Sequence, residues 1–162
     1  MSWITKKVRG GIDENGVPYQ TVWEIGRLRL HCFHRGDIDP DPHDHMWDFW
    51  TFPLVSYIER IWTSGLAPDE GEWHYQAVHA WRIHKRSAEH THLLVCAVSH
   101  PRPIWTIVWR GPNRREWGFW VLREKQTSKM VGYDGRKFVP WRQYIYEREY
   151  EWQKNQTTAA RD

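Results

Sequence analysis

The sequence predicts an all-β fold, either a sandwich or a closed barrel. Short apolar or alternating runs recur about every 8 to 12 residues between turn-forming residues, with no strong internal helix and no alternation of strands with helices. Tryptophan is unusually frequent, with 13 among 162 residues. Its large ring and single N–H donor favour sheets and pocket walls over a plain helical core, which agrees with a β-rich fold.

The chain has the usual length of one domain, and it contains no convincing repeat or break in composition. We expect an N-terminal arm at residues 1–16, a β-barrel at residues 17–145, and a partly disordered C-terminal extension at residues 146–162. The barrel would therefore hold nearly all of the core.

The first expected elements are a hairpin and a two-faced strand. The Asn-Gly pair within IDENGVPY, residues 12–19, is a hairpin signal. In the run that follows, polar and apolar residues alternate from Arg27 to Cys32 with a period of two, which is typical of a strand with two different faces. The polar face is expected to be solvated unless one of its arginines turns inward to hold an anion. GDIDPDPHD, residues 36–44, is expected to be a loop.

Further strands follow in order. MWDFWTFPLVSYIERIW, residues 46–62, predicts one or two strands, with Pro53 at an edge or a bulge. More strands are expected within residues 73–85, 91–99, 103–111 and 111–122, and the polar residues 123–137 predict a loop. A short extended piece then leads into a helix from about Trp141.

Bulk properties exclude several function classes. The net charge is only +3 and no long basic run occurs, so we expect no nucleic-acid partner. No segment approaches the roughly 20 apolar residues of a membrane span, and the N-terminus lacks the apolar run of a signal peptide, so we expect a cytoplasmic protein without membrane contact. Cys32 and Cys96 are expected to be buried free thiols in a reducing compartment.

Two pairs of histidines are the strongest functional signal. His43 and His45 lie two residues apart, and so do His90 and His92, each pair at the start of an apolar run. Residues i and i+2 of an extended segment project to the same side, so both rings of a pair can point into one cavity. Neutral imidazoles gathered in this way favour a divalent transition metal. The competing interpretation is a polar loop that contains histidine by chance.

Carboxylates lie close to the first pair. Asp48 is the nearest one that can complete a set of two or three histidines and one carboxylate. Asp44 lies between the two histidines and is expected to point away from the metal, toward solvent or toward an imidazole N–H.

These motifs resemble the cupin superfamily. PHDHMWDFWTFPLVSYIE resembles its first motif and IHKRSAEHTHLLV its second, and HDHMWDFW, RGPNRREWGFW and VPWRQY look like segments of small cupin-like proteins of bacteria and their phages. The resemblance covers about residues 28 to 144 and implies a double-stranded β-helix, or jelly-roll barrel. It implies a metal bound by His43, His45 and His92, with Fe²⁺ as the first choice and Zn²⁺, Mn²⁺ or Ni²⁺ as alternatives. It implies a fold more firmly than a reaction.

The chain departs from the cupin pattern at the carboxylate. The first motif usually has a glutamate four or five residues after its second histidine, where this chain has Phe49 and Trp50. Asp48 comes one position early, so the ligand set is either three histidines alone, with His90 as a further candidate, or includes Asp48 as metal ligand and catalytic group.

The function expected from these features is a metal-dependent enzyme acting on a small polar molecule, first of all an oxygenase. The alternatives are a metal-free epimerase or isomerase and a barrel that binds a nucleotide or sugar without turnover. Arg29 and Tyr57 are further catalytic candidates, whereas Glu59 is expected to be exposed on its strand. Six tryptophans are candidates for lining the cavity: Trp47, Trp50, Trp81, Trp105, Trp109 and Trp117. A homodimer formed through edge strands is also expected.

Overall fold

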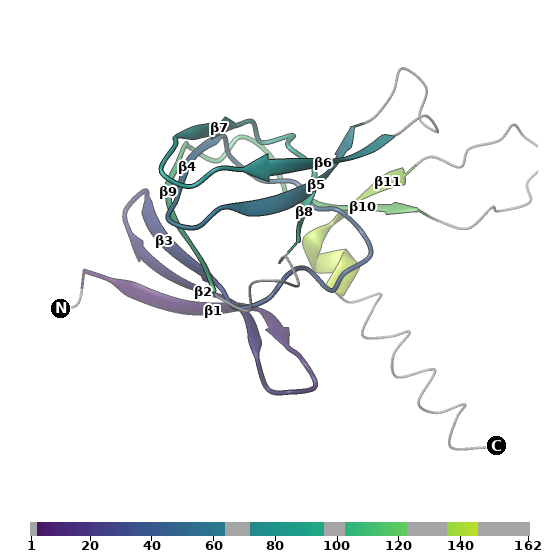
Figure 1. Ribbon diagram of the computed structural model, residues 1–162. Helices are drawn as coiled ribbons and strands as arrows, with labels where there is room; N and C mark the ends of the chain where they lie inside the picture. The colour runs from purple at the N-terminus through teal and green to yellow at the C-terminus, as the bar shows by residue number, and fades with distance from the viewer. Residues whose placement is uncertain (1–2, 64–71, 96–102, 123–135, 146–162) are drawn as a thin grey trace, which may run out of the picture.

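A computed structural model describes residues 3–63, 72–95, 103–122 and 136–145, and it confirms the all-β prediction (Figure 1). Within these ranges the strands are β1 (Thr5–Ile12), β2 (Pro18–Ile25), β3 (Leu28–Phe33), β4 (Phe49–Pro53), β5 (Tyr57–Thr63), β6 (Glu72–Val78), β7 (His84–Arg86), β8 (His92–Val95), β9 (Ile104–Arg110), β10 (Gly118–Leu122) and β11 (Arg136–Pro140). Residues 141–145 form a short helical segment, which begins where the sequence predicts a helix.

The strands form two antiparallel sheets. The first sheet has the order β1-β2-β3-β9-β4-β7. The second contains β6-β5-β8 and the hairpin β10-β11, which are linked by the segment around His43. His43 forms bridges with both His92 on β8 and Phe119 on β10, so this short segment takes the place of a strand between them.

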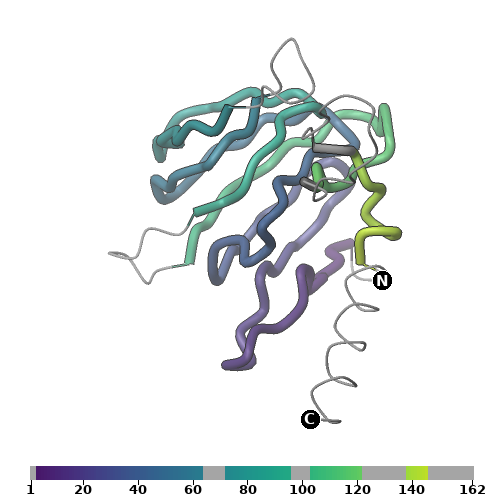
Figure 2. The backbone as a smooth tube through the Cα atoms, turned by 90° about the vertical axis from the view of Figure 1, so that its right-hand side faces the viewer, coloured from purple at the N-terminus to yellow at the C-terminus, as the bar shows by residue number. Residues whose placement is uncertain are grey.

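From β3 to β9, successive elements alternate between the two sheets except for β5 and β6, as in a jelly roll. β3, β4, β7 and β9 belong to the first sheet, whereas the His43 segment, β5, β6 and β8 belong to the second. This order gives two four-stranded layers, β3-β9-β4-β7 and His43 segment-β8-β5-β6, and confirms the cupin-like jelly-roll barrel. The hairpin of β1 and β2 projects from the barrel in both views (Figures 1 and 2).

Local sequence explains the hairpins at the N-terminal end. The Asp13 carboxylate accepts hydrogen bonds from the backbone N–H groups of Asn15 and Val17, at 2.9 and 2.8 Å, and Gly16 adopts a φ of 77°. The predicted Asn-Gly hairpin is therefore confirmed, and its first strand, β1, lies within the arm expected at residues 1–16. A second turn at Gly26, with a φ of 57°, separates β2 from β3.

The prediction that the polar face of β3 is solvated is wrong for Arg29 and His31, and Arg29 instead follows the alternative of an arginine turned inward toward a carboxylate. Arg29 and His31 are buried, whereas Leu28 on the opposite face is 41% exposed. His31 Nδ1 lies 3.0 Å from the Gln20 amide nitrogen, and Arg29 pairs with Glu24 at 3.2 Å. The barrel interior at this end is therefore polar and held by paired side chains, which is how buried polar groups are tolerated.

Apolar clusters surround this polar interior. Buried side chains form three clusters: Tyr57, Val78, Leu94 and Ile104; Trp47, Phe49 and Val108; and Phe119, Val139 and Tyr144. Cys32 is a buried free thiol, whereas Cys96 lies outside the described residues. The loop predicted at residues 123–137 lies mostly outside the described ranges, and its last residues belong to β11. No helix in the described ranges has the length and apolar character needed to cross a bilayer.

Candidate metal centre

Backbone pairing brings the two His-x-His segments together. The His43 N–H donates to the His92 carbonyl at 3.1 Å, and the His92 N–H donates to the His43 carbonyl at 3.0 Å. The rings of His43 and His92 then lie 5.0 Å apart, and those of His45 and His92 lie 5.1 Å apart. One ring nitrogen from each of His43, His45 and His92 lies within 4.8 Å of the other two.

The geometry of this three-histidine group fits a transition metal. His45 Nε2 and His92 Nε2 are 3.2 Å apart. Two nitrogens that each lie about 2.1 Å from one ion, the usual metal–imidazole distance, subtend an angle of about 100° at that separation. This value falls between the octahedral and tetrahedral angles, so the two rings are already spaced as neighbouring ligands.

The protonation states of the group also suit a metal. Burial lowers the pKa of His43 to about 4 and lowers the pKa of His45 well below its ordinary value. Both imidazoles are therefore neutral at neutral pH, and each has one lone-pair nitrogen. Neutral imidazoles are the form that binds divalent transition metals.

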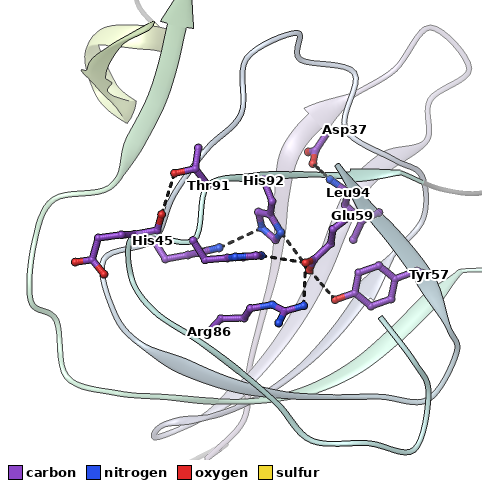
Figure 3. A network of polar contacts seen from close by, with 10 residues as sticks. Asp37, His45, Tyr57, Glu59, Arg86, Thr91, His92 and Leu94 are labelled. Carbon is purple, nitrogen blue, oxygen red and sulfur yellow. Dashed lines mark hydrogen bonds and ion pairs between the residues drawn. The ribbon is translucent and has the colours of Figure 1, made fainter. Parts of the chain in front are cut away.

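A buried glutamate holds the outer side of His92 (Figure 3). Glu59 is 1% exposed, and its Oε1 lies 3.1 Å from His92 Nδ1. This contact lies off the straight hydrogen-bond direction, yet it favours the tautomer that carries hydrogen on Nδ1 and directs the lone pair of Nε2 toward His45 Nε2. A carboxylate behind a ligating histidine commonly orients the ring in metalloproteins.

Glu59 also belongs to a second cluster that can be compared with the first. Glu59, His90 and His92 each offer a ligand atom within 4.8 Å of the others. However, the Glu59 carboxylate already contacts Arg86 at 3.1 Å, His90 at 3.0 Å and the Tyr57 hydroxyl at 3.2 Å, in addition to His92. These contacts use its acceptor positions and place a guanidinium where a metal ion would be repelled. The second cluster is better suited to an ion network.

The electrostatics of Glu59 agree with that interpretation. Burial alone would raise the pKa of Glu59, but attraction to His92 and contacts with His90 and His92 bring it well below its usual range. The expectation that Glu59 is exposed is therefore wrong. Its signal in the sequence was the alternation Tyr57, Glu59, Ile61, which places the glutamate on the face shared by two large apolar residues.

Asp48 does not lie in either cluster of the described residues, which corrects the expectation that it binds the metal. Its carboxylate accepts the Ala88 N–H at 2.8 Å and pairs with Arg114. Asp48 lies three positions after His45, so alternation directs the two side chains to opposite faces.

Asp44 points away from the histidines, as expected, but into the protein. It is fully buried and accepts hydrogen bonds from the Gly118 N–H at 3.0 Å and the Trp120 indole at 3.1 Å. Arg115 completes this set at 2.9 Å. Asp44 therefore fixes the His43 segment against β10 and makes no hydrogen bond to an imidazole among the described residues.

The two other catalytic candidates contact the site indirectly. The Arg29 guanidinium lies 5.1 Å from the ring of Trp47, and Trp47 stacks on His45 with centroids 5.6 Å apart. The Tyr57 hydroxyl donates to Glu59, which in turn contacts His92. Each residue therefore contacts a neighbour of a histidine and not a histidine itself, and a catalytic role for them stays a prediction. Arg86, which no sequence pattern singled out, joins the network through Glu59.

Comparison with known proteins yields only distant structural similarity. No protein-family model and no curated protein matches the chain. Among solved structures, the chain is similar to Fe(II)-HppE with the alternative substrate (S)-1-HPP, at a TM-score of 0.47 and 12% identity, and to FeII HppE, at 0.47 and 14%. Each match covers 65% of this chain and 56% of the other, so the chain spans just over half of their length. The assignment of the fold rests on the strand order instead.

Proposed function

We propose that this protein is a metal-dependent jelly-roll enzyme, in the cytoplasm, that acts on a small polar molecule. His43, His45 and His92 bind the metal, with Fe²⁺ as the first choice and Zn²⁺, Mn²⁺ or Ni²⁺ as alternatives. The observation that carries the proposal is the convergence of three imidazole nitrogens within 4.8 Å, two of them 3.2 Å apart. Three protein ligands leave open positions on an ion of this kind, as a catalytic site requires.

The chain's own residues give the site its form. Trp47 and Phe49 pack on the ring of His45, at centroid distances of 5.6 and 4.7 Å, and keep that side of the ligand dry. The guanidinium of Arg29, which is paired with Glu24, lies over the ring of Trp47. Glu59 fixes the tautomer of His92. When bound, Fe²⁺ would supply dioxygen activation, and the oxygenase is therefore the reaction class that we propose.

Nitric oxide tests the oxygenase proposal without knowledge of the substrate. We expect the protein loaded anaerobically with one equivalent of Fe²⁺ to give, after nitric oxide is added, the electron paramagnetic resonance signal of a high-spin ferrous nitrosyl. The signal requires an exchangeable position on iron, which three protein ligands leave. Iron that binds tightly but gives no such signal would identify a closed structural site and would refute the oxygenase.

A metal-free acid–base enzyme is the second candidate. The hydrogen-bonded pair of His90 and Glu59, at 3.0 Å, favours it because such a pair can relay a proton. This candidate is supported over the first if the purified protein binds no divalent metal tightly and keeps its bound ligand or its activity when a metal chelator is added.

A further inference from the structure

The outer surface of the first sheet is an extended apolar face. Cross-strand partners on this side form two apolar rows across β2, β3, β9 and β4. The first row is Trp23, Leu30, Ile107 and Phe52, and the second is Ile25, Leu28, Trp109 and Trp50. The alternate residues of these strands, such as Val22, Thr51 and Val108, are buried and face the barrel interior. We call these two rows, together with Trp81 and Ile83, the outer apolar face.

This face exposes more apolar surface to water than is usual for a monomeric protein. Trp109 is 50% exposed, Trp81 69% and Ile83 72%. An open groove on the face is lined by Trp50, Phe52, Ile83, Ile107 and Trp109, together with Thr51. The partly exposed large side chains leave on the order of 750 Å² of apolar surface in contact with water, whereas the largest apolar patch of a typical monomer is about 300–600 Å².

Trp81 is held on this face in a strained conformation. Its φ is 62°, the only positive value for a non-glycine residue in the described ranges. Its N–H donates to the Pro53 carbonyl at 2.9 Å, and its ring contacts the edge of Phe52 with centroids 6.0 Å apart. A bulky residue in this region is unfavourable, and such strain concentrates at functional positions. The fold therefore keeps an exposed indole beside the groove although glycine would be easier to accommodate.

We propose that the outer apolar face binds the same face of a second copy of this chain. The area of the outer apolar face is consistent with a second copy of the chain, because a standard interface buries about 800 Å² on each partner. The composition agrees as well: tryptophan is enriched and charge is scarce in interface cores. In the described chain, two charged residues are cross-strand partners of these rows: Lys6 on β1 and Lys85 on β7, the two outer strands of the sheet. Their ammonium groups lie over the rings of Trp23 and Trp50.

Symmetry and sheet geometry favour a second copy over an unrelated partner. A two-fold interface must be complementary to itself, which an uncharged apolar surface is and a surface of one charge is not. Two sheets of equal twist pack face to face at about 30° with interdigitating side chains. The candidate metal centre is built from the His43 segment and from His92 on β8 of the second sheet, so pairing through the outer side of the first sheet leaves it free. The predicted homodimer thus uses a sheet face and not the exposed edge strand β1, and this inference does not depend on the proposed function.

Sedimentation velocity of the full chain from about 1 to about 100 µM tests the proposal, since interfaces of this area associate at micromolar concentration or tighter. We expect a dimer for the wild type, and for Trp109→Glu a dissociation constant raised about 30-fold or more, the effect of a central interface residue. Tyr75→Ser is the matched control because Tyr75 is 68% exposed but lies on β6 of the second sheet. This variant should dimerise like the wild type.

Trp81→Gly separates association from folding. Glycine accommodates a positive φ, so the thermal stability of the monomer should be unchanged or higher, whereas the dimer should weaken. A wild type that stays monomeric at about 100 µM would overturn the proposal. So would a dimer that tolerates both Trp109→Glu and Trp81→Gly.

Discussion

Replacing Glu59 by alanine is expected to lower the free energy of unfolding by about 3–5 kcal/mol, the usual cost of removing one partner from a buried ion pair. The carboxylate is 1% exposed and contacts Arg86, His90, His92 and Tyr57. Its removal leaves the Arg86 guanidinium, which is 12% exposed, without its carboxylate partner. Urea denaturation followed by tryptophan fluorescence measures the change.

Two matched variants identify the cause of that loss. Glu59→Gln keeps the size and one acceptor oxygen, so it should lose clearly less stability than Glu59→Ala. Glu72→Ala removes an exposed carboxylate from the neighbouring strand β6 and should stay within about 0.5 kcal/mol of the wild type. If the unfolding free energy of Glu59→Ala also stays within about 0.5 kcal/mol of the wild type, the network contributes little to stability.

The second large effect is expected for His92→Ala, which should raise the dissociation constant for Fe²⁺ by more than about 100-fold. Loss of a residue that hydrogen-bonds to a metal ligand already weakens metal binding about 10–100-fold. His92 is proposed as a ligand itself, so its loss should have a larger effect. Its ring contacts both His45 Nε2 and Glu59. Titration of the metal-free protein with Fe²⁺ under anaerobic conditions measures the constant, and circular dichroism verifies that the β fold is retained.

The control for this experiment is another histidine of the second sheet. His74 is exposed on β6, so His74→Ala should bind the metal as the wild type does. Full affinity in His92→Ala would remove this residue from the ligand set and with it the proposed centre.

Sequence patterns determined much of the fold because strand periodicity is a local property. The pairs His43 with His45 and His90 with His92 could be recognised from spacing alone, and jelly-roll pairing then brings residues 43 and 92 into register. The hairpin at Asn15 and Gly16 is equally local. Features of this kind are determined by a few neighbouring residues in the sequence.

The errors at the polar face of β3 and at Glu59 share one physical cause: alternation shows which residues share a face but not which face lies inside. In this barrel Arg29, His31 and Glu59 are inside, whereas Leu28, Trp50 and Trp109 are partly or largely exposed outside. The polar interior is stable because its groups pair with residues far away in the sequence, such as Glu59 with Arg86 and Asp44 with Arg115. Long-range pairs of this kind leave no periodic signal.

The most direct test of the three-histidine centre is X-ray absorption at the iron K-edge of the protein loaded with one equivalent of Fe²⁺. The geometry predicts the outer-shell scattering of three imidazole rings, with nitrogen ligands at about 2.0–2.2 Å. Binding without imidazole scattering, or a spectrum fitted by a single imidazole, would contradict the assignment of His43, His45 and His92 to one metal ion.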